Sequence, residues 1–332
     1  MTRIAINGFG RIGKLALRSI LERNLSVEVV AVNDLSGTET AAHLFQFDSA
    51  YGRFPGTVQH NNENLIINGK KIKVCADREP ENLPWKELGV DIVLECTGVF
   101  RTREGATKHL KAGAKRVIIS APGKDEIDGT FVMGVNEKSF KDSDVIISNA
   151  SCTTNCIAPV VKVLNDNFGI ERGLMNTVHS YTSSQPVIDA AQKDLRRSRA
   201  AGESIIPTTT GAAKAVSLVI PELEGKLDGF AIRIPTLTVS IVDLTFETKK
   251  DISVEIINKA FKKASEGELK GILGYEERPL VSIDYRKDSR SSIIDAELTK
   301  TMGAKFAKVV AWYDNEWGYA CRLVDLAEYI SR

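Results

Sequence analysis

The chain has 332 residues, of which 43% are hydrophobic and 26% are charged, and its formal net charge at pH 7 is +1. This length suits two domains better than one, and the near-neutral charge does not favour a nucleic-acid-binding or membrane-surface protein. No apolar run approaches the roughly 20 residues of a membrane-spanning helix, and the first residues lack the pattern of a secretory signal. The low and odd count of five cysteines indicates a reducing compartment, so we expect a cytoplasmic protein.

The first half of the chain alternates short β-rich segments with helical segments. Strands are predicted where β-branched residues cluster, and helices where apolar residues recur every three or four positions. The predicted strands are 2–8, 27–34, 91–98, 116–122 and 144–150, and the predicted helices are 11–23 and 103–114. Such alternation is typical of a parallel sheet with right-handed crossovers.

The second half is different in style, because its strands are longer and some alternate apolar and polar residues. This pattern is typical of an antiparallel sheet with one covered face. Strands are predicted over 173–182, 229–250, 280–287 and 305–314, and helices over 253–267 and 316–332. The change of style falls near Ala150, where we place a domain boundary. The segment 149–154 is therefore expected to run from a strand end into a helix at a junction, where ligand sites are common.

A glycine-rich loop follows the first predicted strand and opens the first helix. Gly8, Gly10 and Gly13 match the pattern G-x-G-x-x-G. In this context the glycines permit a tight turn, a close approach of the backbone to a pyrophosphate, and close helix–strand packing. Asp34 ends the next strand, where a carboxylate would bond a ribose 2′-hydroxyl and repel a 2′-phosphate. The loop predicts a dinucleotide site that favours NAD over NADP.

Two cysteines, Cys152 and Cys156, lie four residues apart after the predicted junction. A structural disulfide between them is disfavoured, because five cysteines in 332 residues indicate a reducing compartment. A zinc site would need further ligands nearby, and a redox motif would need two intervening residues rather than three. A single activated thiol is the interpretation that remains.

The position of Cys152 favours this interpretation. If Ser151 or Asn149 caps the helix, the thiol lies in the first turn, where the helix dipole and free N–H groups favour a thiolate. Cys156 would lie one turn deeper and face the interior. Of the four histidines, only His179 lies in the second half, at the end of a predicted strand, and it is the candidate base. Taken alone, each of these residues would more commonly be an ordinary core or surface residue.

The motifs, taken in order, resemble those of the phosphorylating glyceraldehyde-3-phosphate dehydrogenase family over almost the full chain. They are INGFGRIG, SNASCTTNC, HSYT, TTTGAAKA, RIPT, VSIVDLT and WYDNEWGY. The resemblance implies an α/β protein with a Rossmann-type NAD-binding domain at 1–150, on which the helix 316–332 packs. It implies an α+β catalytic domain with a mostly antiparallel sheet at 151–315.

The resemblance also implies ligands and residue roles. NAD would be the cofactor, glyceraldehyde 3-phosphate and inorganic phosphate the substrates, and the chain would form a homotetramer without a metal. Cys152 would be the nucleophile, His179 the base and Cys156 a second, non-catalytic cysteine. The implied cofactor-binding residues are Gly8, Gly10, Arg11, Ile12, Gly13, Asp34, Arg78, Ser120, Asn315 and Tyr319. The implied residues of the substrate-phosphate and inorganic-phosphate sites are Ser151, Thr153, Thr182, Arg197, Thr210, Gly211 and Arg233.

These implied phosphate sites agree with chemistry, because hydroxyls and arginines are suited to holding two anions near one thiol. Without the resemblance, the basic run 193–199 would be interpreted as a solvated loop and Thr208 to Thr210 as a helix-capping cluster. A capping cluster and an anion site are compatible, because a helix N-terminus also binds anions.

The loop 183–194 departs from the pattern of many NAD-specific family members. Ser184 stands where they have an aspartate, and Ala190 and Ala191 stand where they have Leu-Pro. In the family this loop reaches the adenosine end of a neighbouring subunit's cofactor, so small residues are expected to loosen discrimination against NADP. Asp34 followed by Leu35 still favours NAD. We therefore expect an NAD-preferring enzyme with some use of NADP.

Three alternatives remain beside this interpretation. Erythrose-4-phosphate dehydrogenase would share the nucleophile, the base and the glycine loop, although its threonine-glycine phosphate motif usually differs. A cysteine hydrolase would share a thioester intermediate, but it would not need the glycine loop with Asp34. A non-catalytic RNA-binding module finds no support in the charge or in aromatic–basic interleaving.

Overall fold

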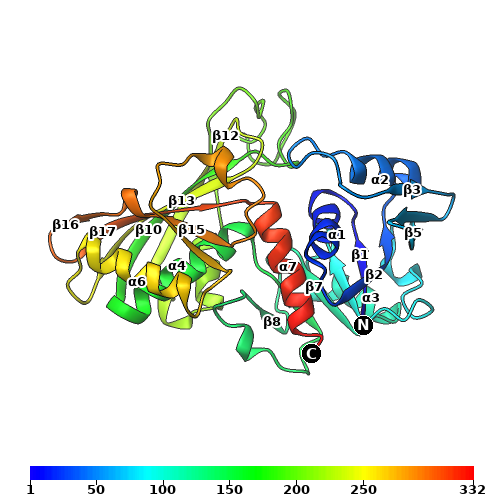
Figure 1. The fold of residues 1–332 in the computed structure, drawn as a ribbon, viewed down its shortest axis with the longest axis horizontal. Coiled ribbons are helices and arrows are strands. Elements are labelled where there is room, and N and C mark those ends of the chain that lie inside the picture. The colour runs from blue at the N-terminus through cyan, green and yellow to red at the C-terminus, as the bar shows by residue number, and fades with distance from the viewer. The chain divides into compact units, whose positions relative to one another are not determined.

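The computed structural model describes residues 1–332, which form two compact units (Figure 1). Unit 1 comprises 1–131, 137–151 and 320–332, and unit 2 comprises 132–136 and 152–319. These bounds differ in two details from the predicted boundaries at 150 and 316. Residues 132–136 belong to unit 2, and the chain returns to unit 1 at residue 320.

Unit 1 is built on a nine-stranded sheet with the order β3-β4-β5-β2-β1-β6-β7-β9-β8. Its strands are β1 (Thr2–Asn7), β2 (Val27–Asn33), β3 (Val58–His60), β4 (Asn64–Ile67), β5 (Lys70–Cys75), β6 (Ile92–Glu95), β7 (Arg116–Ile119), β8 (Gly129–Thr130) and β9 (Ile146–Ser148). All neighbouring strands from β5 to β8 in this order pair in parallel, and the two pairs β3–β4 and β4–β5 are antiparallel. The chain passes from β1 to β2 on one side and later to β6 on the other, so β1 lies at the topological switch point, where α/β sheets bind ligands.

The helices of unit 1 are α1 (Arg11–Arg23), α2 (Gly37–Gln46) and α3 (Arg103–Lys111), with the later part of α7 (Trp317–Tyr329). α1 has the predicted bounds and ends at Asn24, whose left-handed conformation closes the helix. α7 is tied to α1 within this unit by an ion pair between Arg23 and Asp325 at 2.6 Å. α2 and the strands β3 to β5 were not predicted.

Unit 2 is built on an eight-stranded sheet with the order β11-β12-β10-β13-β17-β15-β14, and β16 pairs with β17. Its strands are β10 (Ile170–Ser180), β11 (Ile206–Thr209), β12 (Leu227–Ile234), β13 (Ser240–Thr248), β14 (Leu273–Glu276), β15 (Ser292–Asp295), β16 (Lys300–Met302) and β17 (Phe306–Tyr313). Only the pairs β10–β12 and β14–β15 are parallel, so the expected mostly antiparallel sheet is confirmed.

One face of this second sheet is covered by helices (Figure 1). α4 (Cys152–Phe168) packs against β10, β13, β15 and β17, and α6 (Val254–Glu266) packs beside α4 and against β14. The α6 helix has the predicted bounds, because Ser253 caps its first turn through Ile256 N and Gly267 ends it. A short helix, α5 (Ala212–Ala215), follows β11.

Two strand predictions in the second half are wrong. The segment predicted as one strand over 229–250 is broken between β12 and β13, because Pro235 has no N–H to donate and Val239 has a φ of 72°. The break lets β12 and β13 lie on opposite sides of β10.

The segment 280–287 is a 3₁₀ turn at Ser282–Tyr285 rather than a strand. The Asp284 carboxylate accepts a hydrogen bond from Val281 N at 2.9 Å, a local bond that competes with sheet formation. The strand lies further on, at β15.

A buried polar network joins the carboxyl ends of β1 and β6 in unit 1. Glu95 is 1% exposed, and its carboxylate accepts hydrogen bonds from Asn7 Nδ2 at 2.6 Å, from His109 Nε2 at 3.0 Å, and from the backbone and hydroxyl of Thr97. Trp85 Nε1 donates to His109 Nδ1 at 3.0 Å, which fixes the proton of that imidazole on Nε2. Every polar atom that faces the carboxylate is therefore a donor.

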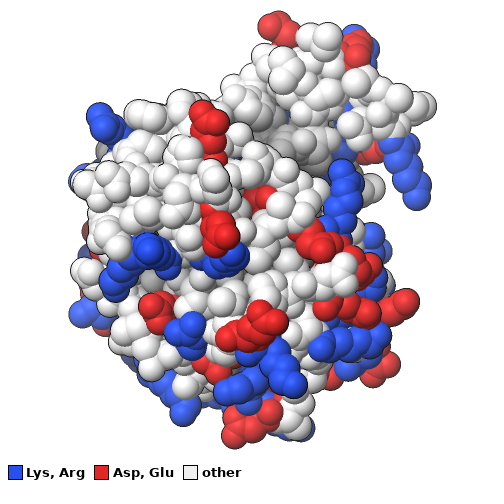
Figure 2. Space-filling view, turned by 90° about the vertical axis from the view of Figure 1, so that its right-hand side faces the viewer, with Lys and Arg blue, Asp and Glu red and all other residues white.

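The surface of the molecule carries charges of both signs. In the face shown in Figure 2, Lys and Arg side chains are interspersed with Asp and Glu side chains, as the formal net charge of +1 implies. None of the helices combines the length and the apolar composition that crossing a bilayer requires.

The donor-only surroundings of Glu95 lead to a prediction about stability. Glu95→Gln places an amide NH₂ group against donors, and it is expected to lower the free energy of unfolding by about 2–4 kcal/mol. Urea unfolding followed by circular dichroism measures the change. The control is Glu63→Gln, whose carboxylate makes a surface pair with Lys73 at 3.0 Å, and it should change stability by less than about 0.5 kcal/mol. Equal effects of the two substitutions would contradict the prediction.

Candidate active site

The glycine loop of unit 1 forms a cradle at the end of β1. Gly8 has a φ of +90°, and a Cβ atom there would lie 2.7 Å from Thr97 N. A Cβ atom at Gly13 would lie 2.3 Å from Gly8 O, whereas nothing lies within 4 Å of the equivalent position at Gly10. No side chain caps the start of α1. The loop is therefore tightly packed at Gly8 and Gly13, open at Gly10, and followed by a helix N-terminus without a side-chain cap. This arrangement fits a pyrophosphate.

The other residues of unit 1 that were predicted to bind the cofactor differ in the contacts they make. Asp34 accepts hydrogen bonds from Ser36 through Oδ1, so its Oδ2 remains available to a ribose hydroxyl. Arg11 forms an ion pair with Asp48 at 2.5 Å. Burial is the largest single effect and raises the pKa of Asp48, but the charge and hydrogen bond of Arg11 together with the backbone N–H groups of Ala50 and Tyr51 hold that pKa below its ordinary value. Arg78 is exposed after β5, and Ile12 and Ser120 are half-buried.

The thiol of Cys152 lies at the first residue of α4, after a sharp turn at Ala150, which has a φ of 55° and is fully buried. A non-glycine residue in this conformation indicates a backbone held in place by its surroundings. Cys152 Sγ lies 3.5 Å from Nε2 of His179, which is close enough for proton transfer between them. The structure thus brings together the predicted nucleophile and the predicted base from a helix start and a strand end.

His179 is 2% exposed at the end of β10, and its environment keeps it neutral. Burial and the charge of Arg233 lower the pKa of His179 to about 3. Nδ1 lies 2.7 Å from the carbonyl oxygen of Ser180, which accepts a proton, and also beside Nη1 of Arg233, which donates one, so these two contacts do not fix the imidazole tautomer. In the tautomer with the proton on Nδ1, Nε2 carries the lone pair that faces the thiol. Arg233 pairs with His179 in the β10–β12 register and places Nη1 2.6 Å from Nδ1 and 3.0 Å from Ser180 O.

The same surroundings act on the thiol with opposing effects. Burial raises the pKa of Cys152, while the charge of Arg233 and hydrogen bonds from Thr153 and the first-turn N–H groups of α4 lower it. The net direction is upward. The helix start lowers the pKa of Cys152, as its position predicts, but burial has the larger effect.

Cys156 lies one turn further along α4 and is completely buried. Its Sγ lies 3.6 Å from Ser292 Oγ and 3.9 Å from Ala311 O, and burial raises its pKa strongly. All five cysteines are free, and no group of three or more His, Cys, Asp or Glu residues is placed to hold a metal. Cys156 is thus a protonated packing residue of the helix core.

The floor of the site is formed by Tyr313, a residue that the sequence interpretation missed. Its hydroxyl bonds Thr153 Oγ1 at 3.0 Å and Thr177 Oγ1 at 2.9 Å, and its ring packs edge-on against His179 with centroids 5.9 Å apart. Tyr313 lies within the motif WYDNEWGY, but its role depends on partners more than 130 residues away. No local pattern could have identified it.

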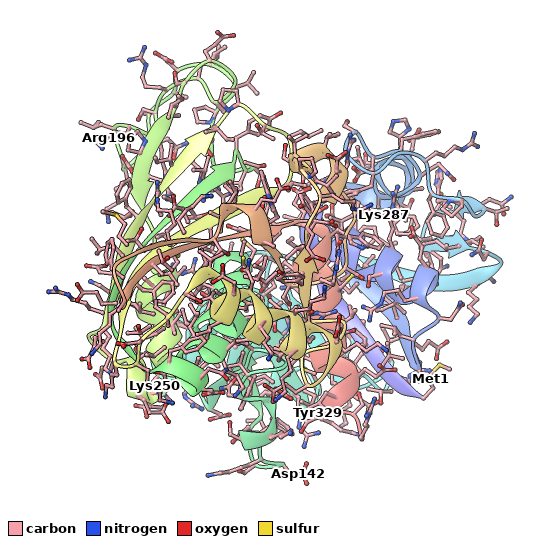
Figure 3. All side chains as sticks on the ribbon, turned by 60° about the vertical axis from the view of Figure 1, so that its left-hand side comes forward. Met1, Asp142, Arg196, Lys250, Lys287 and Tyr329 are labelled. Carbon is pink, nitrogen blue, oxygen red and sulfur yellow. The ribbon has the colours of Figure 1, made fainter.

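The predicted anion-binding residues separate into clusters. Arg197 Nε donates to Thr208 Oγ1 at 2.8 Å, and Thr208 donates in turn to Asp194 at 2.7 Å. Arg196, the adjacent arginine, is exposed and points away from the sheet (Figure 3). The charge of Arg197 lowers the pKa of Arg233, although burial is the larger cause. Two arginines that repel each other near His179 indicate a site for an anion.

The other predicted phosphate residues are engaged locally. Thr182 Oγ1 lies 2.9 Å from Ser184 Oγ. Thr210 Oγ1 accepts a hydrogen bond from Ala212 N at 3.2 Å, and Gly211 lies at the N-cap of the short helix α5. Thr210 thus accepts a hydrogen bond from a first-turn N–H of α5 at the position before the N-cap, while the N-cap residue itself, Gly211, makes no side-chain cap bond. Ser151 precedes the thiol and is half-buried.

Two predicted cofactor residues follow β17. Asn315 is 5% exposed, and its Oδ1 accepts a hydrogen bond from Ser240 Oγ at 2.9 Å. Tyr319, at the start of α7, is 4% exposed. Ser240, like Tyr313, was not identified from the sequence, because its partner lies 75 residues away.

Comparisons with known proteins agree with this site. A family model described as the glyceraldehyde 3-phosphate dehydrogenase NAD binding domain matches residues 2–103, and one described as the C-terminal domain of the same enzyme matches residues 151–315. The second match includes both the candidate nucleophile and the candidate base.

Curated relatives match the chain over its whole length. The glyceraldehyde-3-phosphate dehydrogenase of Geobacillus stearothermophilus is 59% identical over 330 residues, which cover 99% of this chain and 98% of the relative. Glyceraldehyde-3-phosphate dehydrogenase 2 of Nostoc sp. is 56% identical over 334 residues, covering 100% and 99%. Glyceraldehyde-3-phosphate dehydrogenase 1 of Bacillus cereus is 55% identical over 332 residues, covering 100% and 99%. With two domain models and full-length relatives in agreement, the chain belongs to the glyceraldehyde-3-phosphate dehydrogenase family.

Proposed function

We propose that this protein is an NAD-dependent glyceraldehyde-3-phosphate dehydrogenase, which acts in glycolysis and gluconeogenesis and forms 1,3-bisphosphoglycerate through a thioester on Cys152. The observation that carries the proposal is the 3.5 Å contact between Cys152 Sγ and Nε2 of a buried, neutral His179. A neutral imidazole beside a thiol is the arrangement that nucleophilic acyl chemistry requires.

The residues of unit 1 fit NAD. Gly8 and Gly13 leave no room for side chains, Gly10 opens onto free space, and Asp34 offers a carboxylate oxygen to a ribose hydroxyl. We propose that these residues hold the dinucleotide together with Arg11, Ile12, Arg78 and Ser120, and that Asn315 and Tyr319 hold its nicotinamide end. When bound, NAD accepts a hydride from the substrate carbon.

The reaction begins with proton transfer from the thiol. His179 Nε2 takes the proton of Cys152, and the thiolate adds to the aldehyde carbon. The proton returns to the carbonyl oxygen and gives a thiohemiacetal. His179 takes that hydroxyl proton again as the hydride departs, which leaves a thioester on Cys152. Inorganic phosphate then attacks the thioester carbon, expels the thiolate and forms the acyl phosphate.

Two phosphate groups must be held during this sequence. We assign the phosphate of the substrate to Thr182 and Arg233, and the attacking phosphate to Ser151, Thr153, Thr210 and Gly211, with Arg197 serving both. The mutual repulsion of Arg197 and Arg233 supports this assignment, because an anion relieves it. Arg197 is already oriented by Thr208 and Asp194, so binding an anion loses little side-chain entropy.

The domain roles follow from these residue assignments. We propose that 1–150 with 316–332 forms the NAD-binding domain and that 151–315 forms the catalytic domain.

The location and the oligomeric state are separate proposals. The five free cysteines suit a cytoplasmic location. The face of the second sheet opposite α4 carries exposed apolar side chains in three successive cross-strand rows, Leu174 at 69%, Phe230 at 50% and Phe306 at 38%. We propose that further copies of the chain cover this face in a homotetramer.

The assay that tests the proposed function measures NAD reduction with glyceraldehyde 3-phosphate. Reduction should be fast with inorganic phosphate and slow without it, because the thioester then accumulates. Erythrose 4-phosphate serves as the competing substrate, and higher efficiency with it would overturn the proposal. No observation on the structure favours that alternative.

Replacing the nucleophile tests the covalent mechanism. Cys152→Ser is expected to lower turnover by more than about 10³-fold, because a serine hydroxyl beside neutral His179 is a far weaker nucleophile than a thiolate. NAD binding, followed by calorimetry, should be retained. Cys156→Ala removes the other sulfur of α4 and should leave oxidation measurable. Near-normal turnover of Cys152→Ser would rule out the thioester.

Replacing the base tests the proton transfer. His179→Asn is expected to lower kcat by roughly 10²–10⁴-fold. Because burial raises the pKa of Cys152, a thiol without an imidazole must lose its proton to water at higher pH. The curve of alkylation rate against pH should therefore shift upward. His43→Asn, at an exposed histidine of unit 1, is the control. Unchanged alkylation curves for His179→Asn would contradict the role of the base.

Cofactor preference tests the role of Asp34. Initial rates with NAD and NADP should give kcat/KM at least about tenfold higher for NAD, since the carboxylate repels a 2′-phosphate. Asp34→Asn keeps the shape of the side chain and removes its charge, so it should narrow the difference. Equal efficiency of the wild type with the two cofactors would refute the preference.

A further inference from the structure

A row of buried polar side chains crosses the parallel sheet of unit 1 where its central strands end. Asn7, Asn33 and Glu95 are the last residues of β1, β2 and β6, and the strand register places Asn7 opposite both of the others. All three side chains are buried. Burying polar groups costs free energy unless they are hydrogen-bonded, and an apolar row would pack there without that requirement. The row therefore indicates a purpose beyond packing.

The Asn33 side chain bonds both backbone groups of a residue that lies outside the sheet. Its Nδ2 donates to Asp77 O at 2.8 Å, and its Oδ1 accepts from Asp77 N at 3.0 Å. Because β5 ends at Cys75, the Asn33 amide pairs with a residue two positions beyond the strand. A backbone N–H can only donate and a backbone carbonyl can only accept, so these two contacts fix the orientation of the amide.

The bonds along the rest of the row follow from that orientation. Asn33 Nδ2 also lies 2.7 Å from the Asn7 side chain, so the facing atom of Asn7 must be its acceptor, Oδ1. Asn7 Nδ2 then donates to the Glu95 carboxylate at 2.6 Å. The two hydrogens of Asn33 Nδ2 are both used, one toward Asp77 and one toward Asn7. A continuous chain of hydrogen bonds therefore joins the buried carboxylate to the backbone of the loop after β5.

This chain of bonds ends beside two residues of the proposed cofactor site. Asp34 follows Asn33 directly, and Arg78 follows Asp77 directly. Asp34 N donates to Cys75 O at 2.9 Å, which ties the end of β2 to the end of β5. Arg78 is exposed, so the position of its side chain depends on the backbone that carries it. The Asn33 amide thus holds the backbone on either side of the place where these two charged groups begin.

We propose that Asn33 is a positioning residue that fixes the spacing of Asp34 and Arg78, so that the carboxylate and the guanidinium meet the dinucleotide as one preformed unit. The inference rests on the proposed function, which assigns both residues to NAD. Preorganisation of this kind raises affinity, because the loop after β5 loses less freedom when the ligand binds. Asn33 acts through its two neighbours, and no contact of its own with the cofactor is needed.

Replacing Asn33 with alanine tests the inference through a split between two kinetic constants. Asn33→Ala should bind NAD about tenfold more weakly by calorimetry, and KM for NAD should rise by a similar factor. At saturating NAD, kcat and KM for glyceraldehyde 3-phosphate should change by less than about threefold, because the chemistry lies in unit 2. The control is Asn258→Ala in unit 2, which removes an amide that bonds Ala296 O at 3.1 Å and Thr299 Oγ1 at 2.8 Å. NAD affinity should not change in the control.

A double-mutant cycle separates positioning from a general loss of stability. Arg78→Ala alone should weaken NAD binding by about fivefold, because a charged contact is lost. In the Asn33→Ala background the same substitution should weaken binding by less than about twofold, because the arginine has already lost its fixed position. A residue that only stabilises the fold would leave the factor for Arg78→Ala equal in the two backgrounds.

Hydrogen exchange of wild-type protein tests the same bond without a substitution, and it decides the matter if Asn33→Ala does not fold. In the absence of NAD, the Asp77 N–H should exchange at least about 10²-fold more slowly than in an unstructured chain, because the Asn33 amide holds it. Fast exchange of this N–H, equal factors in the cycle, or unchanged NAD affinity of Asn33→Ala would overturn the inference. Failure of wild-type protein to bind NAD would instead contradict the proposed function.

Discussion

The contact between Cys152 and His179 depends on a neutral imidazole, and burial is what makes it neutral. A thiol and an imidazole in water would exchange a proton near neutral pH, but here burial disfavours charge on both groups. Arg233 adds a positive charge that favours a thiolate and disfavours an imidazolium. Both groups are therefore neutral in the free protein, and charge separation is expected only when a substrate binds. Arg197, Arg233 and the hydroxyl groups of Thr153, Thr177 and Tyr313 surround the position of that charge.

The two sheets position different parts of the site. The parallel sheet of unit 1 carries the glycine loop at the carboxyl end of β1, its switch point, which suits a long, extended ligand. The second sheet places β10 between a parallel and an antiparallel neighbour, so the strand that carries His179 near its end is hydrogen-bonded on both sides. A base on a central strand is held more rigidly than one on a loop, which favours proton transfer over a short distance.

Local signals in the sequence predicted a good part of the structure. The helices α1 and α6 have the predicted bounds, because apolar periodicity and capping residues act within one segment. The prediction of 229–250 as a single strand was wrong, because Val239 takes its conformation from Asp314, Asn315 and Ser180, which are distant in sequence. Likewise, Cys152 and His179 could be paired through their motifs, whereas Tyr313 and Ser240 act through contacts that only the fold creates.

The buried network around Glu95 has a practical consequence for measurement. The chain has three tryptophans, and Trp85 is the one that lies in unit 1, bonded through its indole N–H to His109, while Trp312 and Trp317 belong to unit 2. Each unit therefore contains its own fluorophore. Replacing Trp85, or the other two, with phenylalanine would yield proteins whose emission reports on one unit at a time, so that the order in which the two units lose structure can be observed directly.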